Sequence, residues 1–221
     1  MYALLAATAY PQAISHMEKR GGAPQLIVDG APFLVLSGEL ANTAPSNLDY
    51  MQRVFPVLAG KVHLNTVLTP MAWAWIEPQE GKYDFHLADA AIEQANQYNL
   101  RIVWLWFGSW KNGQSSFVPG WVKANQERFP RAQIQNGKSV EVLSALSESN
   151  WQADARAFAA LMRHVREVDK NHRVIMAQVE NEVGLLGDSR DRSPLANEAF
   201  GKPVPREFLD YLQKHKDSLL P

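Results

Sequence analysis

Three adjacent polar residues, Glu180, Asn181 and Glu182, are the strongest candidates for chemistry in this sequence. They follow an apolar run, 174–179, that carries β-branched residues and comes after a polar turn, which is typical of a buried strand. Carboxyl groups can donate or accept protons in catalysis, and they are costly to bury without partners. Barrel enzymes place their catalytic residues at this end of a strand. The pattern favours a functional site, and the alternative is a strand that simply leaves the core at Glu180.

Tryptophan is the second chemical signal, because all seven residues of this type fall within the stretch 73–151. Trp104 and Trp106 lie inside a predicted strand, where an indole ring is expected to fill the core. An indole can also stack on the apolar C–H face of a sugar ring. The tryptophans that follow predicted strands, on the face expected for Glu182, are interpreted as such platforms: Trp73, Trp75 and Trp110.

Strand-like and helix-like segments alternate along the chain up to the candidate site. Predicted strands cover residues 33–36, 64–68, 102–107 and the run that starts at 174. Helical spacing of apolar residues predicts helices over 46–60, 87–98 and 151–168. Strands that alternate with helices at this rhythm predict parallel βαβ units without an internal linker.

One long irregular stretch, 108–150, interrupts this alternation. Loops of this length are usually functional or disordered. Within it, the dipeptide Asn136-Gly137 stands between two short segments and is a hairpin signal.

Composition excludes several function classes. The chain has 221 residues and a net charge of −1, so it carries no basic footprint for nucleic acid. No apolar run reaches membrane-spanning length. The six histidines show no ligand spacing, and we expect no metal. Cysteine is absent, which leaves the redox compartment open.

The first 13 residues contain a short apolar stretch that resembles the tail of a signal peptide without its basic region. If this stretch is such a remnant, the protein is periplasmic or secreted. An ordinary N-terminal tail is the alternative, and the compartment is then unknown.

Three sequence blocks carry a family resemblance. The first runs from 64–67 through Trp73 to the turn 77–85, the second covers 108–121, and the third is the heptapeptide QVENEVG at 178–184. On these blocks, which lie within roughly residues 31–187, the chain resembles the start of a family 35 glycoside hydrolase. This is the β-galactosidase family within the clan of retaining (β/α)8-barrel glycosidases. The third block is the most specific of the three.

The resemblance implies a role for each matching residue. Glu182 would be the general acid/base, and Asn181 would hydrogen-bond the sugar 2-hydroxyl. Glu180 would support them, and Glu77 would anchor its loop. Trp73 and Trp110 would contact the substrate. The segment that would contact galactose after the third strand consists of Asn112, Gly113 and Gln114.

Three departures from the family pattern leave the exact sugar open. Gln114 stands where many members have a Glu, and a neutral amide accepts a hydrogen bond less strongly than a carboxylate. Pro70 and Val183 stand where the family usually has Tyr.

The implied fold is an α/β TIM (β/α)8 barrel, of which this chain would hold about the first four βα units. Residues 1–30 would form an N-terminal segment, and residues 31–221 the N-terminal half of the catalytic barrel. The family's nucleophile is a Glu at the end of the seventh strand. The later residues Glu198 and Glu207 do not follow an apolar strand, so the nucleophile is expected outside this chain.

The implied function is retaining hydrolysis of terminal β-galactosides, without a cofactor. The expected partner is the carbohydrate substrate, and the oligomeric state is open. Two alternatives remain: a non-catalytic carbohydrate-binding half-barrel, and a retaining β-glycosidase of the same clan with another sugar specificity, such as a glucosidase, a mannanase or a family 42 galactosidase.

Overall fold

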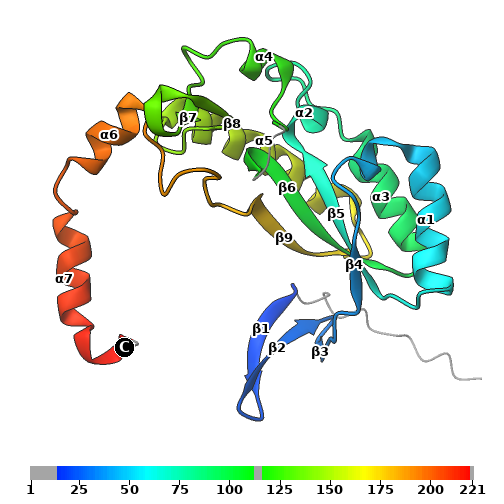
Figure 1. Ribbon diagram of the computed structural model, residues 1–221. Coiled ribbons are helices and arrows are strands. Elements are labelled where there is room, and N and C mark those ends of the chain that lie inside the picture. Colours follow the sequence, from blue (N-terminus) through cyan, green and yellow to red (C-terminus); the bar gives the residue numbers. More distant parts are fainter. Residues whose placement is uncertain (1–13, 112–115, 220–221) are drawn as a thin grey trace, which may run out of the picture.

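The centre of the computed structural model, which describes residues 14–111 and 116–219, is a parallel sheet of four strands. The strands lie in the order β4-β5-β6-β9, and each pair of neighbours is parallel (Figure 1). Their bounds are β4 Ser37–Glu39, β5 Thr66–Ala72, β6 Arg101–Lys111 and β9 Val174–Asn181. The predicted α/β class and parallel sheet are therefore confirmed.

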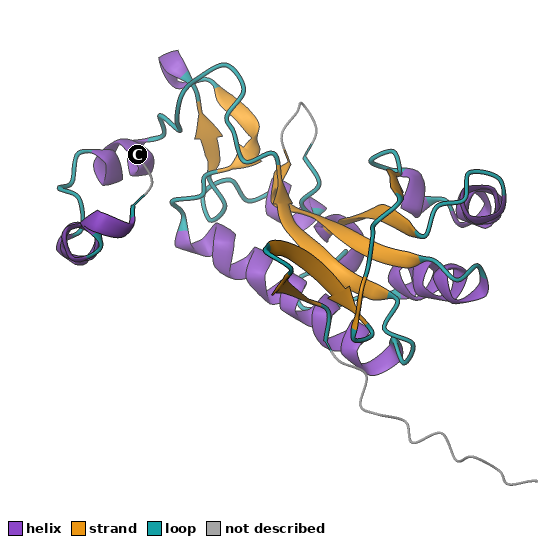
Figure 2. Ribbon diagram, turned by 90° about the horizontal axis from the view of Figure 1, so that it is seen from below, coloured by secondary structure: helices purple, strands orange, loops and turns teal. Residues whose placement is uncertain are grey.

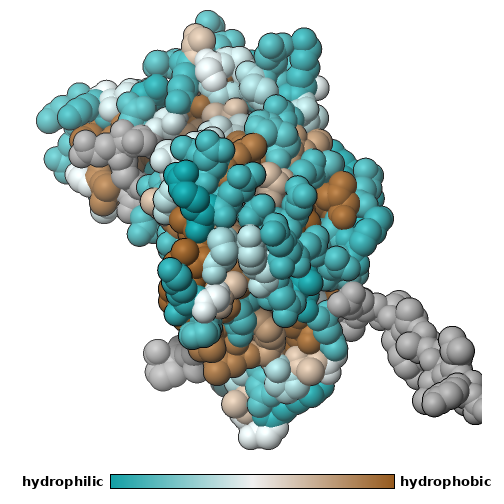
Figure 3. Space-filling model, turned by 90° about the vertical axis from the view of Figure 1, so that its right-hand side faces the viewer, coloured by the Kyte–Doolittle hydropathy of each residue, from teal (hydrophilic) through white to brown (hydrophobic). Residues whose placement is uncertain are grey.

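Three helices cover one face of the sheet, which we call the helix face (Figure 2). They are α1 Leu48–Gly60, α3 His86–Gln97 and α5 Glu148–Val168. Each presents an apolar stripe inward, for example Met51 and Phe55 of α1, which are buried in the main core. The three predicted helices are thus present, with bounds shifted by up to three residues. Seen from the side of α1 and α3, the outer surface is mostly hydrophilic (Figure 3).

Side chains of β6 alternate between the two faces of the sheet. Trp104 and Trp106 belong to the core cluster under the helices and are fully buried, as predicted. Leu105 and Phe107 belong to a second cluster on the opposite face, which we call the open face. An N-terminal hairpin contributes Val28 to this second cluster. The hairpin strands are β1 His16–Arg20, β2 Ala23–Val28 and the short β3 Ala31–Pro32.

The predicted strand at 33–36 is wrong, because the parallel strand β4 begins only at Ser37. The side chain of Asn65 explains the difference. Its amide oxygen accepts from the Leu36 backbone N–H at 2.9 Å, and its amide nitrogen donates to the Leu34 carbonyl at 2.8 Å. One side chain therefore takes the place of a ladder partner in this segment.

Strand β5 extends four residues beyond its predicted end, through Pro70 to Ala72. Proline cannot donate to a ladder and is usually confined to edge positions. Strand β4 pairs with β5 only as far as Leu68, so Pro70 has no β4 residue opposite it. The short neighbour makes the proline tolerable inside an otherwise central strand.

The interval between β6 and α5 holds small elements rather than a single loop. The Asn136-Gly137 hairpin is confirmed, with both residues at positive φ between antiparallel β7 and β8. The elements of this interval are α4 Gly120–Lys123, β7 Arg131–Gln133, η2 Gln135–Gly137 and β8 Ser139–Leu143. The short helices near β5 are η1 Ala44–Ser46 and α2 Trp73–Ile76.

The segment after β9 extends away from the sheet (Figure 1). Its elements are α6 Pro194–Phe200, α7 Arg206–Lys214 and η3 Lys216–Ser218. Helix α7 buries no residue and exposes Phe208 and Tyr211. No helix among the described residues is long and apolar enough to cross a membrane.

Among the described residues, no strand pairs with the outer edge of β9, and this predicts self-association of the chain. Val179 is 57% exposed on the edge strand, and exposed apolar edges invite pairing with another chain. We expect the purified chain to dimerise or aggregate as its concentration rises, measured by light scattering after size exclusion. The Val179→Lys substitution should shift this equilibrium toward monomer. Val168→Lys, at the end of α5, makes the same chemical change away from the edge and should not. A wild-type chain that stays monomeric at all concentrations would contradict the expectation.

Candidate active site

The carboxyl ends of β6 and β9 bring the central candidate residues together. Asn181 is the last residue of β9 and pairs with Lys111, the last residue of β6. The ladder between Trp106 and Lys111 contains a register shift, so both strands leave regular geometry before they end. The candidate site thus lies at the edge where barrel enzymes place their catalytic groups.

Glu182 follows β9 directly and is held near Lys111. The Glu182 carboxylate lies 3.6 Å from the Lys111 ammonium, and the Glu182 side chain is 65% exposed. The Lys111 side chain is only 11% exposed, and its ammonium lies 5.1 Å from the centre of the Phe107 ring. Because Phe107 belongs to the open-face cluster, Glu182 is oriented toward the open face of the sheet.

Lys111 is a site residue that the sequence pattern does not predict. Its predicted strand stopped at Phe107, whereas β6 continues to Lys111. A polar residue that follows an unbroken strand pattern by four positions gives little local signal. The one usable signal is that neighbouring parallel strands end at the same edge of a sheet, which places the residues after Phe107 near the end of β9.

Asn181 is buried and its amide is oriented by Gln178. The Asn181 side-chain oxygen accepts from the Gln178 amide nitrogen at 2.8 Å, and the same nitrogen also donates to the Glu180 carbonyl at 3.2 Å. In this orientation the Asn181 amide nitrogen has no hydrogen-bond partner among the described residues. It is therefore a donor available to a ligand.

The backbone at the end of β9 is strained at two glutamates. Glu180 has φ of 64° and Glu182 has φ of 49°, in the left-handed region that costs a non-glycine residue roughly 1–3 kcal/mol. A regular strand would point both side chains to the same face, and this is what the strand pattern predicts. The left-handed residue breaks that alternation. Glu180 turns to the helix face, so the assumption of a shared direction is wrong.

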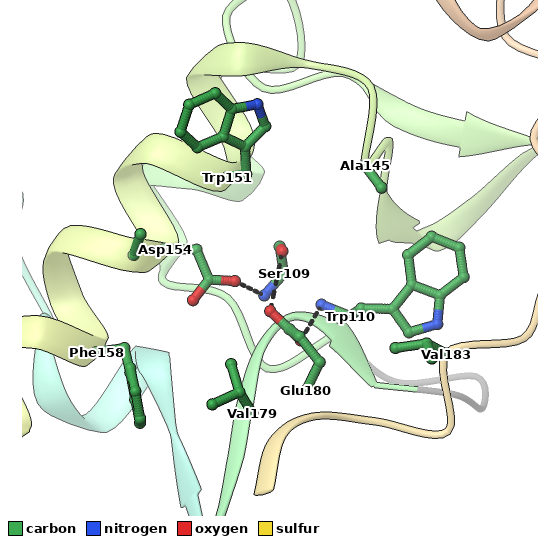
Figure 4. A pocket seen from close by; sticks show the side chains of 10 residues that line it. Ser109, Trp110, Ala145, Trp151, Asp154, Phe158, Val179, Glu180 and Val183 are labelled. Carbon is green, nitrogen blue, oxygen red and sulfur yellow. Dashed lines mark hydrogen bonds between the residues drawn. The ribbon is translucent and has the colours of Figure 1, made fainter. Parts of the chain in front are cut away.

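The Glu180 carboxyl lies against the end of β6 and helix α5 (Figure 4). It accepts from the Trp110 backbone N–H at 2.7 Å and from the Ser109 hydroxyl at 3.2 Å. Beside it lies a cavity of about 470 Å³. Most of the cavity lining is apolar, and the large side chains are Trp110, Trp151, Phe158, Val179 and Val183.

Asp154 of α5 is the second carboxyl group at this cavity. It is buried, and its two oxygens accept from the Trp106 indole N–H at 2.7 Å and the Ser109 backbone N–H at 2.5 Å. A Cβ atom at Gly108 would collide with both Asp154 oxygens. Only glycine leaves room for this contact.

The environment of Glu180, including Asp154, changes its protonation. Burial raises the pKa of Glu180 to about 10, and the hydrogen bond and negative charge of Asp154 add to the rise. The Trp110 N–H and the Ser109 hydroxyl oppose it, because both stabilise the ionised form. At neutral pH, Glu180 is therefore a neutral acid.

The expected role of Trp73 as a sugar platform is wrong. Its indole is fully buried, donates to the Glu77 carboxylate at 2.8 Å and packs edge-on against Trp121. No ring face is left for a sugar. Glu77 also accepts from the Gly81 backbone N–H at 2.8 Å, which confirms its predicted role as a loop anchor.

Trp110 remains a prediction as a substrate contact. It is partly exposed and lines the cavity beside Val183, and its buried indole nitrogen has no hydrogen-bond partner among the described residues. The predicted galactose contacts Asn112, Gly113 and Gln114 lie outside the described residues. Of the candidates that the structure describes, it brings Asn181, Glu182 and Trp110 to one end of the sheet.

Comparison with known families adds to this geometry. The family model of glycoside hydrolase family 42, described as β-galactosidase, matches residues 57–219. A β-galactosidase from Xanthomonas manihotis is 26% identical over 193 residues, which cover 84% of this chain and 29% of that protein. The chain thus spans less than a third of this curated relative.

Two solved structures are similar in fold. An exo-β-1,4-mannosidase from an Opitutaceae bacterium, strain TAV5, superimposes with a TM-score of 0.53 at 18% identity, covering 72% of this chain and 27% of that one. A polyextremophilic β-galactosidase from the Antarctic haloarchaeon Halorubrum lacusprofundi superimposes with a TM-score of 0.56 at 18% identity, covering 82% of this chain and 25% of that one. Identities this low show the α/β fold of these glycosidases alone.

The raised pKa of Glu180 predicts a pH-dependent stability. The folded chain holds this proton up to about pH 10, whereas the unfolded chain releases it near 4.5. Stability should therefore fall as pH rises between these values, by at most about 1.4 kcal/mol per pH unit. The free energy of unfolding, measured with denaturant across this range, should depend less steeply on pH in Glu180→Gln than in wild type. The control Glu167→Gln, an exposed change on α5, should keep the wild-type slope. Equal slopes for wild type and Glu180→Gln would refute the buried acid.

Proposed function

The chain belongs to the β-galactosidases of glycoside hydrolase family 42, and from this premise we propose that it contributes to the hydrolysis of terminal β-galactosides with retention. The observation that carries the proposal is the Asn181–Glu182 pair at the carboxyl end of β9. Glu182 would protonate the leaving oxygen as general acid and later activate water as general base. It is reachable from solvent, as a group that meets the substrate must be.

Asn181 would bind the sugar 2-hydroxyl. Its amide oxygen is occupied by Gln178, which leaves the nitrogen as a donor. A hydrogen bond to the 2-hydroxyl strengthens as the oxocarbenium ion develops, so it favours the transition state over the bound substrate. The orientation by Gln178 supports this role, because the donor is fixed before the sugar arrives.

The second carboxyl required for retention is proposed to lie outside the described residues. The two carboxyls of a retaining site stand about 5–5.5 Å apart. Glu77 and Glu180 are held by other contacts. Glu39 ends β4, three strand spacings from β9, or on the order of 14 Å along the sheet. We therefore propose that residues 31–221 form the N-terminal half of a (β/α)8 barrel, preceded by an N-terminal segment, 1–30.

The sugar specificity is the part of the proposal that needs a direct test. The QVENEVG heptapeptide resembles family 35, whereas the matching family model is that of family 42. A panel of aryl glycosides tests the sugar: preference for galactosides supports the proposal, and preference for mannosides or glucosides would redirect it within the clan. Binding of sugars without any hydrolysis would favour the non-catalytic alternative.

Glu182→Gln in the complete enzyme that contains this chain should lower turnover of a natural disaccharide by about 10²–10⁴-fold. The same variant should still form the glycosyl-enzyme from an activated aryl galactoside, because a good leaving group needs little protonation. Steady-state and burst kinetics on the two substrates measure this. An unchanged rate on the disaccharide would remove Glu182 from its role.

Asn181→Ala should lower kcat/KM on a galactoside, by an amount that corresponds to a rise of about 2–4 kcal/mol in activation free energy. This is the usual effect of losing one donor aimed at developing charge. A 2-deoxy-galactoside is the control, because it lacks the hydroxyl that Asn181 would bind. Wild type and variant should converge on that substrate. Equal losses on both sugars would make Asn181 a purely structural residue.

A further inference from the structure

We propose that Asp154 and Glu180 form a positioning pair, a carboxylate and a carboxylic acid that share one proton and set the direction of β9 at its end. The inference rests on the proposed function, since the pair would act through Asn181 and Glu182 and would touch no substrate.

Both carboxyl groups hold the same short piece of β6, from two different elements. Asp154 reaches it from helix α5, through the Trp106 indole and the Ser109 backbone N–H. Glu180 reaches it from β9, through the Ser109 hydroxyl and the Trp110 backbone N–H. The irregular end of β6 is thus fixed between a helix and the neighbouring strand (Figure 4).

The surroundings require the two carboxyls to share a proton. Asp154 and Glu180 are the only titratable residues that line the described cavity, and no cation faces it. The charged groups at the strand ends, Lys111 and Glu182, pair with one another on the open face. Two carboxylates in contact in an apolar setting repel each other, so one of them holds a proton.

Asp154 is the hydrogen-bond acceptor of the pair. Both of its oxygens already accept from N–H donors, the Trp106 indole and the Ser109 backbone. Glu180 is then the acid, and its proton bridges to Asp154. The raised pKa of Glu180 agrees with this assignment.

The pair explains the strained backbone conformation of Glu180. Glu180 adopts left-handed φ, which places its carboxyl on the helix face and interrupts the strand alternation just before Asn181. Strain of this kind persists only where surrounding contacts hold it. The contacts with Ser109 and Trp110 are those that hold it here, so they determine where the next two residues point.

Three substitutions separate this role from simple packing. In Glu180→Gln the amide nitrogen can donate to Asp154 and the oxygen can accept from Trp110, so the neutral acid is mimicked. Glu180→Ala removes both contacts. Asp154→Asn places an N–H group opposite either the Trp106 or the Ser109 donor, so one contact is lost. Glu167→Gln on α5 is the matched control.

Hydrogen exchange and infrared spectra of the full 221-residue chain test the pair without any activity. We expect a protonated-carboxyl band in the wild type at neutral pH, absent in Glu180→Gln and present in Glu167→Gln. The Ser109 and Trp110 amides should be protected in wild type and in Glu180→Gln, and at least tenfold less protected in Glu180→Ala. No carboxyl band, or equal protection in every variant, would overturn the proposal. If Asp154→Asn does not fold, these Glu180 variants still decide it.

Kinetics of the complete enzyme test the positioning role. We expect Glu180→Ala and Asp154→Asn to lower kcat by about 10–100-fold with little change in KM, because a small displacement of a catalytic group costs this much. Glu180→Gln should restore most of the rate. If Glu180→Gln lowers kcat as much as Glu180→Ala does, the proposal of a shared proton is refuted. A complete enzyme that cleaves no glycoside would refute the proposed function, and with it the positioning role, while exchange and infrared data would still report on the pair.

Discussion

Burial of two carboxyl groups beside the end of β6 is the constraint on which the site depends. Asp154 needs donors for both oxygens, and the strand end supplies the Ser109 N–H only because Gly108 leaves room for the carboxylate. Glu180 then has to meet the same strand end from β9, which requires a left-handed backbone. That conformation reverses the side-chain direction within the QVENEVG heptapeptide. The positions of Asn181 and Glu182 thus follow from how the buried Asp154 and Glu180 carboxyl groups are accommodated beside the same strand end.

The sheet, its order of strands and helices, and the buried Trp104 and Trp106 could be predicted, because hydrophobic periodicity reports burial directly. The strand limits could not. At 33–36 the sequence is as apolar as a strand, yet the side chain of Asn65 satisfies the backbone in place of a neighbour. At Pro70 the local rule argues against a strand, yet the short β4 leaves that position without a partner. Both differences arise from contacts far apart in sequence, which periodicity does not contain.

The candidate site was predicted less completely than the sheet, for related reasons. The Asn181–Glu182 step follows a strongly patterned strand and could be located by motif. The direction of Glu180 depends on one φ angle, and nothing in the local sequence distinguishes it from Glu182. Trp73 follows a strand as a platform would, but a four-residue helix turns its ring into the core, where Glu77 accepts its N–H. Lys111 can be recognised as a site residue only from the structure, where it pairs with Asn181 at the common end of β6 and β9.

The two glutamates of the heptapeptide show how environment separates the roles of identical side chains. Glu180 lies against apolar residues and a second carboxyl, so it keeps its proton and can serve only as a neutral hydrogen-bonding group at neutral pH. Glu182 lies on the other face, beside an ammonium and 65% exposed. A general acid works best where water is excluded from the reacting atoms. The described residues do not exclude water from Glu182, so in the proposed role that exclusion would have to come from the bound sugar and from the proposed remainder of the barrel.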